Sequence, residues 1–293
     1  MKDRKTIKSG MIWLLLSVLL VIAMVFVQTP ARAAVTCPTT STADSDGDGF
    51  TDAEECNGIT LADGITHFPG YLDHLANPNL PRDQYLDPNS KDVFVILIPA
   101  SQTNFPSEPL QFVKTLPITI HSIQPSQATS NVNDYTLDRI VSPGSTLKQK
   151  AVRLTEDATT PYNPTNPGLL GSSGEGTLLS GRDDTTIYTE KIKGLVLSVY
   201  SNAGAGNPPQ DLIDKYIRHV IAHEFGHSIR PLAPVSQADY VNFAGYHYKS
   251  GTTYNGLNVI LDQYVKYTIK GGKVTFYIGT IYTPPDIAGI TLR

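Results

Sequence analysis

Residues 208–229, PPQDLIDKYIRHVIAHEFGHSI, carry the strongest structural pattern in this chain of 293 residues. Asn207 suits the N-cap of a helix and Pro208 its first position, while Pro231 stops the helix shortly after the segment ends. Apolar residues recur at helical spacing along one face, at Ile213, Ile217, Val220 and Ile221. We therefore expect a helix from Pro208 to about Ile229 that packs one face against a core.

The last turns of this helix contain His223-Glu224-Phe225-Gly226-His227, which is the HExxH pattern. Residues four apart differ by about 40° around a helix, so both histidines project from one face and can bind one zinc ion. Glu224 points about 100° away from His223, beside the metal, where its carboxylate can take a proton from zinc-bound water. The pattern predicts His223 and His227 as zinc ligands and Glu224 as the general base of a hydrolase. The alternative is a set of polar residues on a solvated helix face.

A catalytic zinc ion needs a third protein ligand. No glutamate follows the HExxH motif anywhere in the chain, which excludes a downstream glutamate ligand. His247 is the only histidine after the motif, and we expect it to be the third ligand. Asp239 is the alternative. His219 lies one helical turn before the motif, and we interpret it as a supporting or structural residue.

A second chemical pattern lies near the N-terminus, where residues 44–55 read DSDGDGFTDAEE. Acidic residues occupy positions 1, 3, 5, 9 and 12 of this stretch and glycine occupies position 6, which is the spacing of an EF-hand calcium loop. We expect Ca²⁺ to be bound by the side chains of Asp44, Asp46, Asp48, Asp52 and Glu55 and by the carbonyl of Phe50. The alternative is an acidic, solvated turn.

Cys37 and Cys56 are the only cysteines in the chain, and they bracket the acidic loop. In an exported protein we expect them to form a disulfide that closes a loop of about 20 residues and contributes about 3 kcal/mol. Two buried thiols are the alternative. The residues before Asp44 form a poor helix, so the loop resembles those of dockerins and thrombospondin type 3 repeats. We expect the calcium to be structural.

The first 33 residues have the pattern of a secretory signal peptide. Basic residues within positions 1–10 precede an apolar run from Met11 to Val27, and Ala31-Arg32-Ala33 predicts cleavage after Ala33. We expect a secreted, periplasmic or cell-surface protein with no stable membrane insertion after cleavage; an uncleaved anchor is the alternative. The net charge of −4 argues against nucleic acid as a partner, because phosphate contacts need clustered Lys and Arg.

Strand signals surround the helix along the rest of the chain. VFVILIP at 93–99 is a short apolar run typical of a buried strand, and the segments flanking Gly271-Gly272 predict a C-terminal β-hairpin. Residues 57–91 predict an irregular linker and 158–181 a long loop. Weaker strand signals lie in 110–123 and 148–156, and 185–200 fits helix or strand. These elements predict an α+β fold.

With these motifs, the chain resembles secreted bacterial zincin metallopeptidases, and it is similar to metzincins with a longer link between the second and third zinc ligands. The resemblance covers residues 92–293 and implies a catalytic domain with the HExxH helix, a mixed sheet and the C-terminal hairpin. It implies zinc-dependent hydrolysis of a protein or peptide substrate. The mature chain departs from metzincins because it has no methionine for the turn that they place beneath the zinc.

These patterns divide the chain into three parts. We expect a signal peptide over 1–33, a disulfide-closed calcium loop with an irregular linker over 34–91, and a zincin-like domain over 92–293. The alternative function is a noncatalytic extracellular binding protein, organised by calcium, in which the zincin domain is degenerate. Replacing Glu224 by glutamine distinguishes the two, because only the peptidase depends on that carboxylate.

Overall fold

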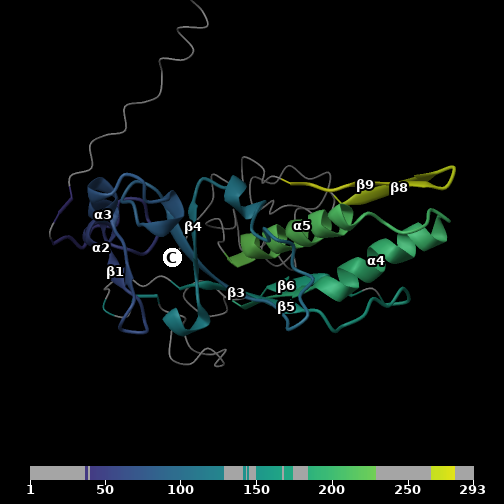
Figure 1. Cartoon of the computed structure of the whole chain (residues 1–293), viewed down its shortest axis with the longest axis horizontal. Helices are drawn as coiled ribbons and strands as arrows, with labels where there is room; N and C mark the ends of the chain where they lie inside the picture. The colour runs from purple at the N-terminus through teal and green to yellow at the C-terminus, as the bar shows by residue number, and fades with distance from the viewer. Residues whose placement is uncertain are drawn as a thin grey trace, which may run out of the picture. The chain divides into compact units, whose positions relative to one another are not determined.

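A five-stranded mixed sheet organises the computed structural model (Figure 1). Its strands are β3 (Asp92–Ile98), β4 (Thr119–Ile123), β5 (Val152–Asp157), β6 (Gly171–Ser173) and β7 (Asp184–Tyr188). They follow the spatial order β4-β3-β5-β7-β6, in which β6 runs antiparallel to β7 and all other neighbours are parallel. The α+β content and the mixed sheet predicted from the sequence are confirmed.

The structure describes residues 37–38, 40–128, 141–142, 144, 150–166, 168–173, 184–228 and 265–280. These residues belong to one compact unit that begins at Cys37. Among them, no helix combines the length and the apolar character needed to cross a membrane. The expected signal peptide over 1–33 lies outside the described residues, as do Asp239 and His247.

Strand β3 confirms the buried strand that the apolar run at 93–99 predicted, and its first five residues are buried. Successive side chains point to opposite faces, as in any strand. Val93 and Val95 belong to one apolar core, whereas Phe94 and Ile96 belong to a second core. Because both faces are covered, the strand is apolar from Val93 to Ile98 rather than alternating with polar residues.

Two helices cover the face of the sheet to which Val95 points. They are α4 (Thr189–Asn202) and α5 (Gln210–Ser228), which lie side by side in Figure 1. The predicted helix is thus confirmed, with its start at Gln210 rather than Pro208. Ile217 and Ile221 of α5 are fully buried in the same core as Val95. The segment 185–200, which fitted either helix or strand, contains most of β7 followed by α4.

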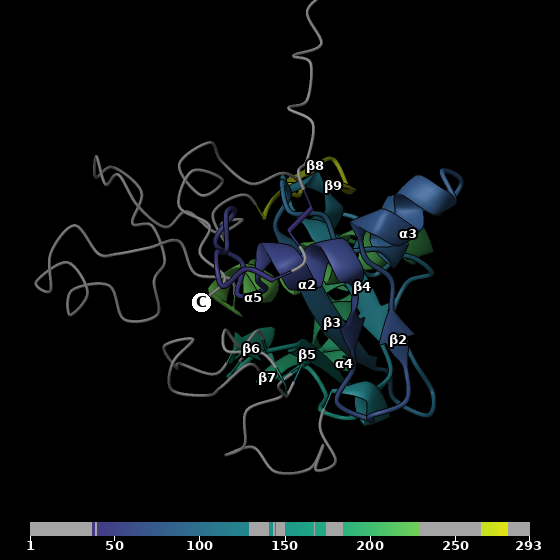
Figure 2. The same ribbon diagram turned by 90° about the vertical axis from the view of Figure 1, so that its left-hand side faces the viewer.

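The segment before β3 covers the opposite face of the sheet. Phe50, inside the acidic loop, packs edge-on against Phe94 with the ring centroids 5.7 Å apart, and both side chains are fully buried. Leu61 and Leu86 belong to the same core, so residues 57–91 take part in it. Short elements form this layer (Figure 2), namely α2 (Asp52–Asn57), β1 (Ile59–Thr60), β2 (His67–Phe68), α3 (Tyr71–Ala76) and the 3-10 helix η1 (Arg82–Gln84).

The predicted C-terminal hairpin is confirmed as the antiparallel pair β8 (Lys266–Lys270) and β9 (Lys273–Tyr277). Gly271 and Gly272 have φ angles of 55° and 75°, the left-handed values that a tight two-residue turn requires and that glycine adopts without strain. Phe276 of β9 contacts Tyr216 of α5, with ring centroids 6.3 Å apart, so the hairpin lies against that helix. Two further 3-10 helices are η2 (Val113–Thr115) and η3 (Pro125–Gln127).

Candidate functional site

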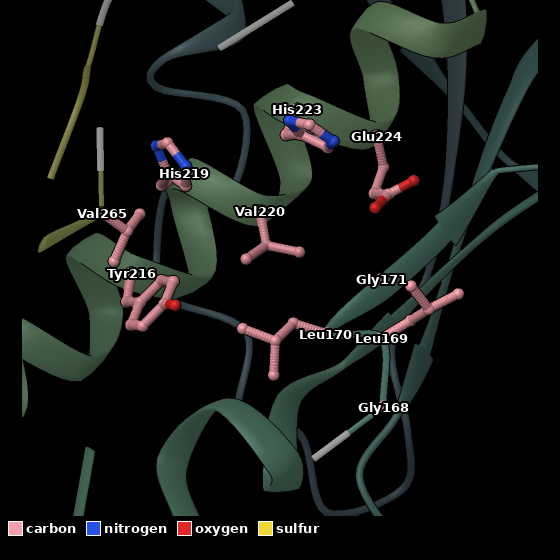
Figure 3. A pocket seen from close by; sticks show the side chains of 10 residues that line it. All are labelled: Gly168, Leu169, Leu170, Gly171, Tyr216, His219, Val220, His223, Glu224 and Val265. Carbon is pink, nitrogen blue, oxygen red and sulfur yellow. The ribbon is translucent and has the colours of Figure 1, made fainter. Parts of the chain in front are cut away.

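The HExxH residues lie in the last turns of α5, which packs against β6 and β7. His223 is 4% exposed and Glu224 is 7% exposed, and both line a cavity of about 250 Å³ (Figure 3). His227 belongs to the same helix one turn later, but its side chain lies outside the described part of the chain. The choice between His247 and Asp239 as third zinc ligand therefore stays a prediction.

Apolar side chains form most of the cavity wall. They are Leu169 and Leu170 before β6, Tyr216 and Val220 on α5, and Val265 before β8. In Figure 3, His219 and His223 lie one turn apart on one side of α5, whereas the Glu224 side chain extends toward β6. The motif's imidazole and carboxylate thus diverge around the helix, as the helical period predicts.

Gly171, the first residue of β6, lies directly against Glu224. A Cβ atom added at Gly171 would be 2.6 Å from Cγ and 2.7 Å from Oε1 of Glu224, closer than real Cβ contacts come. Only glycine therefore leaves the Glu224 carboxylate where it is. No sequence pattern marks this residue, because a single glycine in the turn-rich stretch 158–181 gives no sign of which side chain will approach it.

His219 links α5 to the end of the hairpin. Its ring is 1% exposed, and its Nδ1 lies 2.9 Å from the carbonyl oxygen of Gly279. Since a carbonyl oxygen only accepts hydrogen bonds, Nδ1 must carry a proton and donate it. His219 also lines the cavity beside His223, so this hydrogen bond connects the cavity wall to the residues after β9.

The acidic loop closes on itself around its carboxylates. The backbone N–H groups of Gly47 and Gly49 donate to the carboxylate of Asp44, at 2.6 Å and 3.2 Å. Gly49, at loop position 6, has a φ of 100°, a value that glycine alone adopts easily. The turn brings one oxygen each of Asp44, Asp46 and Asp48 within 4.8 Å of one another, so the expected first three ligands do converge.

A second group of carboxylates shares Asp48 with the first. One oxygen each of Asp48, Glu55 and Asp92 lies within 4.8 Å of the other two, and all three side chains are fully buried. Among the residues that the structure describes, neither oxygen of Glu55 has a hydrogen-bond partner. Asp92 was not among the expected ligands, because it lies in the chain far beyond the loop whose spacing defines the motif.

Burial and mutual repulsion raise the pKa values of carboxylates in this cluster. Burial, followed by the charges of Asp48 and Asp46, raises the pKa of Glu55 to about 11. Burial and the charge of Asp92 raise the pKa of Asp46 to about 7. Buried carboxylates remain charged only when a cation or hydrogen-bond donors compensate them, and clustered oxygens are the ligands that Ca²⁺ prefers. The donor set therefore fits a calcium ion.

Asp52, at loop position 9, differs from the other acidic residues. Its two carboxylate oxygens accept hydrogen bonds from the backbone N–H and the hydroxyl of Ser45, both at 2.8 Å. Asp52 belongs to neither carboxylate group among the described residues. The backbone N–H of Phe50 donates to Asp48 at 2.9 Å, which fixes the chain at the position whose carbonyl was expected as a ligand.

Cys37 and Cys56 lie at disulfide distance, with their Cα atoms 5.5 Å apart. Cys56 directly follows Glu55 in α2, and its side chain is fully buried. Thr51 caps this short helix through a reciprocal pair of hydrogen bonds with Glu54. The bridge and the cap together hold the end of the acidic loop, where the Glu55 carboxylate turns inward.

No protein-family model, curated protein or solved structure matches this chain. The HExxH helix and the acidic loop are therefore the features from which a function is inferred. Both belong to the compact unit that begins at Cys37.

Replacing Gly171 by alanine is expected to displace the Glu224 carboxylate, because the new methyl group would lie 2.6 Å from Cγ of Glu224. If Glu224 is the general base that HExxH predicts, a shift of about 1 Å lowers kcat/KM for a peptide substrate by about 10- to 100-fold. The displaced atoms belong to a flexible side chain, so the thermal unfolding midpoint should change little.

Gly144→Ala is the control for this experiment, because no atom of the described residues lies within 4 Å of a Cβ added at Gly144. It should hydrolyse the peptide at the wild-type rate. Full activity in Gly171→Ala would show that contact with β6 does not position Glu224.

Proposed function

We propose that this chain is an exported, zinc-dependent endopeptidase in which His223, His227 and His247 bind zinc and Glu224 is the general base. The observation that carries the proposal is that HExxH lies within one helix, with His223 and Glu224 buried yet lining the same cavity. A buried imidazole beside a carboxylate is donor chemistry that suits a catalytic zinc ion. Export is proposed from the signal-peptide pattern over 1–33.

In the proposed hydrolysis, the histidines would hold the zinc ion and Glu224 would transfer the proton. A zinc ion bound at the histidines would polarise the scissile carbonyl and lower the pKa of a water molecule. Glu224 extends from α5 toward β6, where its carboxylate can accept the proton of the attacking water and deliver it to the leaving amine. Val220 and Leu170 give this cavity apolar walls, and an apolar surrounding strengthens such electrostatic interactions.

Strand β6 favours a peptide as the substrate. It is the edge strand of the described sheet, paired with β7 on one side. An extended peptide can add to such an edge through main-chain hydrogen bonds. Because Gly171 of β6 lies against Glu224, a peptide bound along this strand would pass beside the general base.

Replacing Glu224 by glutamine should lower kcat for a peptide substrate by about 10²- to 10⁴-fold, because the amide cannot accept the proton of water. Zinc content and the thermal midpoint should stay close to wild type, since the side chains have nearly the same shape. Glu108→Gln, an exposed position, is the control and should remain fully active. Activity that survives in Glu224→Gln would rule out this mechanism. A zinc-loaded wild type without any peptidase activity would favour the noncatalytic binding protein.

We also propose that the loop Asp44–Glu55 binds a structural Ca²⁺ ion. The support is the convergence of Asp44, Asp46 and Asp48, together with the buried carboxylate of Glu55, which lacks hydrogen-bond partners among the described residues. An ion bound only by the folded state stabilises that state. The loop is part of the core through Phe50, so its stability and that of the sheet are connected.

Removing calcium with EGTA should lower the thermal midpoint of the mature chain. At a free calcium concentration about 100 times the Kd, bound calcium contributes about 2.7 kcal/mol. For a domain of this size that corresponds to roughly 5–10 °C. EGTA also binds zinc, so the treated protein is divided and given back either Ca²⁺ or Zn²⁺. Only Ca²⁺ should restore the midpoint; an equal midpoint with and without Ca²⁺ would count against the site.

A further inference from the structure

Asp92, the first residue of β3, lies at the inner side of the acidic loop although no sequence motif connects the two. Its carboxylate is fully buried and lies within 4.8 Å of carboxylate oxygens of Asp48 and Glu55. Within the described part of the chain, both oxygens of the fully buried Glu55 lack hydrogen-bond partners. Three charged carboxylates this close repel one another, and a cation among them would offset that repulsion.

Backbone and side-chain contacts bring the start of β3 onto the loop. The N–H of Asp92 donates to Oδ2 of Asp48 at 2.7 Å. The ammonium group of the preceding residue, Lys91, donates to the carbonyl oxygen of Asp46. Asp92 and the residue before the strand are thus hydrogen-bonded to loop positions 5 and 3, so the loop and the start of β3 form one local structure.

Further contacts hold the Asp92 carboxylate in a fixed orientation. Its Oδ1 accepts hydrogen bonds from the guanidinium of Arg82 at 2.6 Å and from Nε2 of His121 at 3.0 Å. Its Oδ2 accepts from the N–H of Asp87 at 2.8 Å. Held in this way, the carboxylate keeps one oxygen within 4.8 Å of oxygens of Asp48 and Glu55.

We propose that Asp92 is a ligand of the calcium ion, so that the metal joins the acidic loop to the first strand of the sheet. This inference rests on the proposed calcium site in the loop Asp44–Glu55. It adds an oxygen ligand from outside the loop motif. Both carboxylate oxygens of Asp52 accept hydrogen bonds from Ser45. In this proposal Asp52 therefore contributes less to calcium affinity than Asp92 does.

Calcium titration by isothermal calorimetry tests the assignment on the mature, zinc-loaded chain after calcium has been removed. Asp92→Asn keeps the size of the side chain and removes its charge, and it should weaken calcium binding by about tenfold or more, because affinity depends on the charge of the ligands. Asp52→Asn is the matched variant and should change the Kd by less than about threefold. Equal calcium affinity in wild type and Asp92→Asn would overturn the proposal.

A crystal structure of the calcium-loaded wild type gives an independent test, which decides the matter if Asp92→Asn does not fold. An Asp92 oxygen at about 2.3–2.6 Å from the ion supports the proposal. An ion bound in the loop with both Asp92 oxygens beyond about 4 Å overturns this inference alone, because such distances exclude coordination. A wild type that binds no calcium overturns both this inference and the calcium site itself.

Discussion

Strand β3 is buried on both faces, and its alternating side chains connect the two chemically distinctive parts of the molecule. Val93 and Val95 face the core that supports α5 and its HExxH residues. Phe94 and Ile96 face the core that contains Phe50 of the acidic loop. Because a one-residue shift of a strand would exchange its faces, the register of β3 determines how both parts are supported.

The start of the same strand carries an unusual concentration of buried charge. Asp48, Glu55 and Asp92 are fully buried, and the guanidinium of Arg82 pairs with Asp92 from a partly exposed position. Buried carboxylates destabilise the folded state unless their charges are compensated. The proposed calcium ion would offset this cost and would link the acidic loop to the sheet.

Sequence patterns predicted the features that depend on residues close together in the chain. The helical period over 208–229, the apolar run of β3 and the paired glycines of the hairpin each predicted the right element. The spacing of acidic residues in 44–55 likewise identified side chains that converge in the structure.

Features that depend on residues far apart in the chain could not be predicted in this way. Asp92 reaches the loop, and Gly171 reaches Glu224, only because the sheet brings distant segments together. The segments containing β6, β7 and α3 were ambiguous or too rich in turn residues for a periodic signal. Local patterns therefore indicated which chemistry to expect, but the supporting residues required the fold.

The zinc content of purified residues 34–293 tests most directly whether the HExxH helix binds zinc. Elemental mass spectrometry after reconstitution and dialysis should give about one zinc per wild-type chain. His223→Ala should give far less under the same conditions, because it removes an imidazole ligand. A wild type without zinc, or equal zinc in both proteins, would contradict zinc binding by this helix.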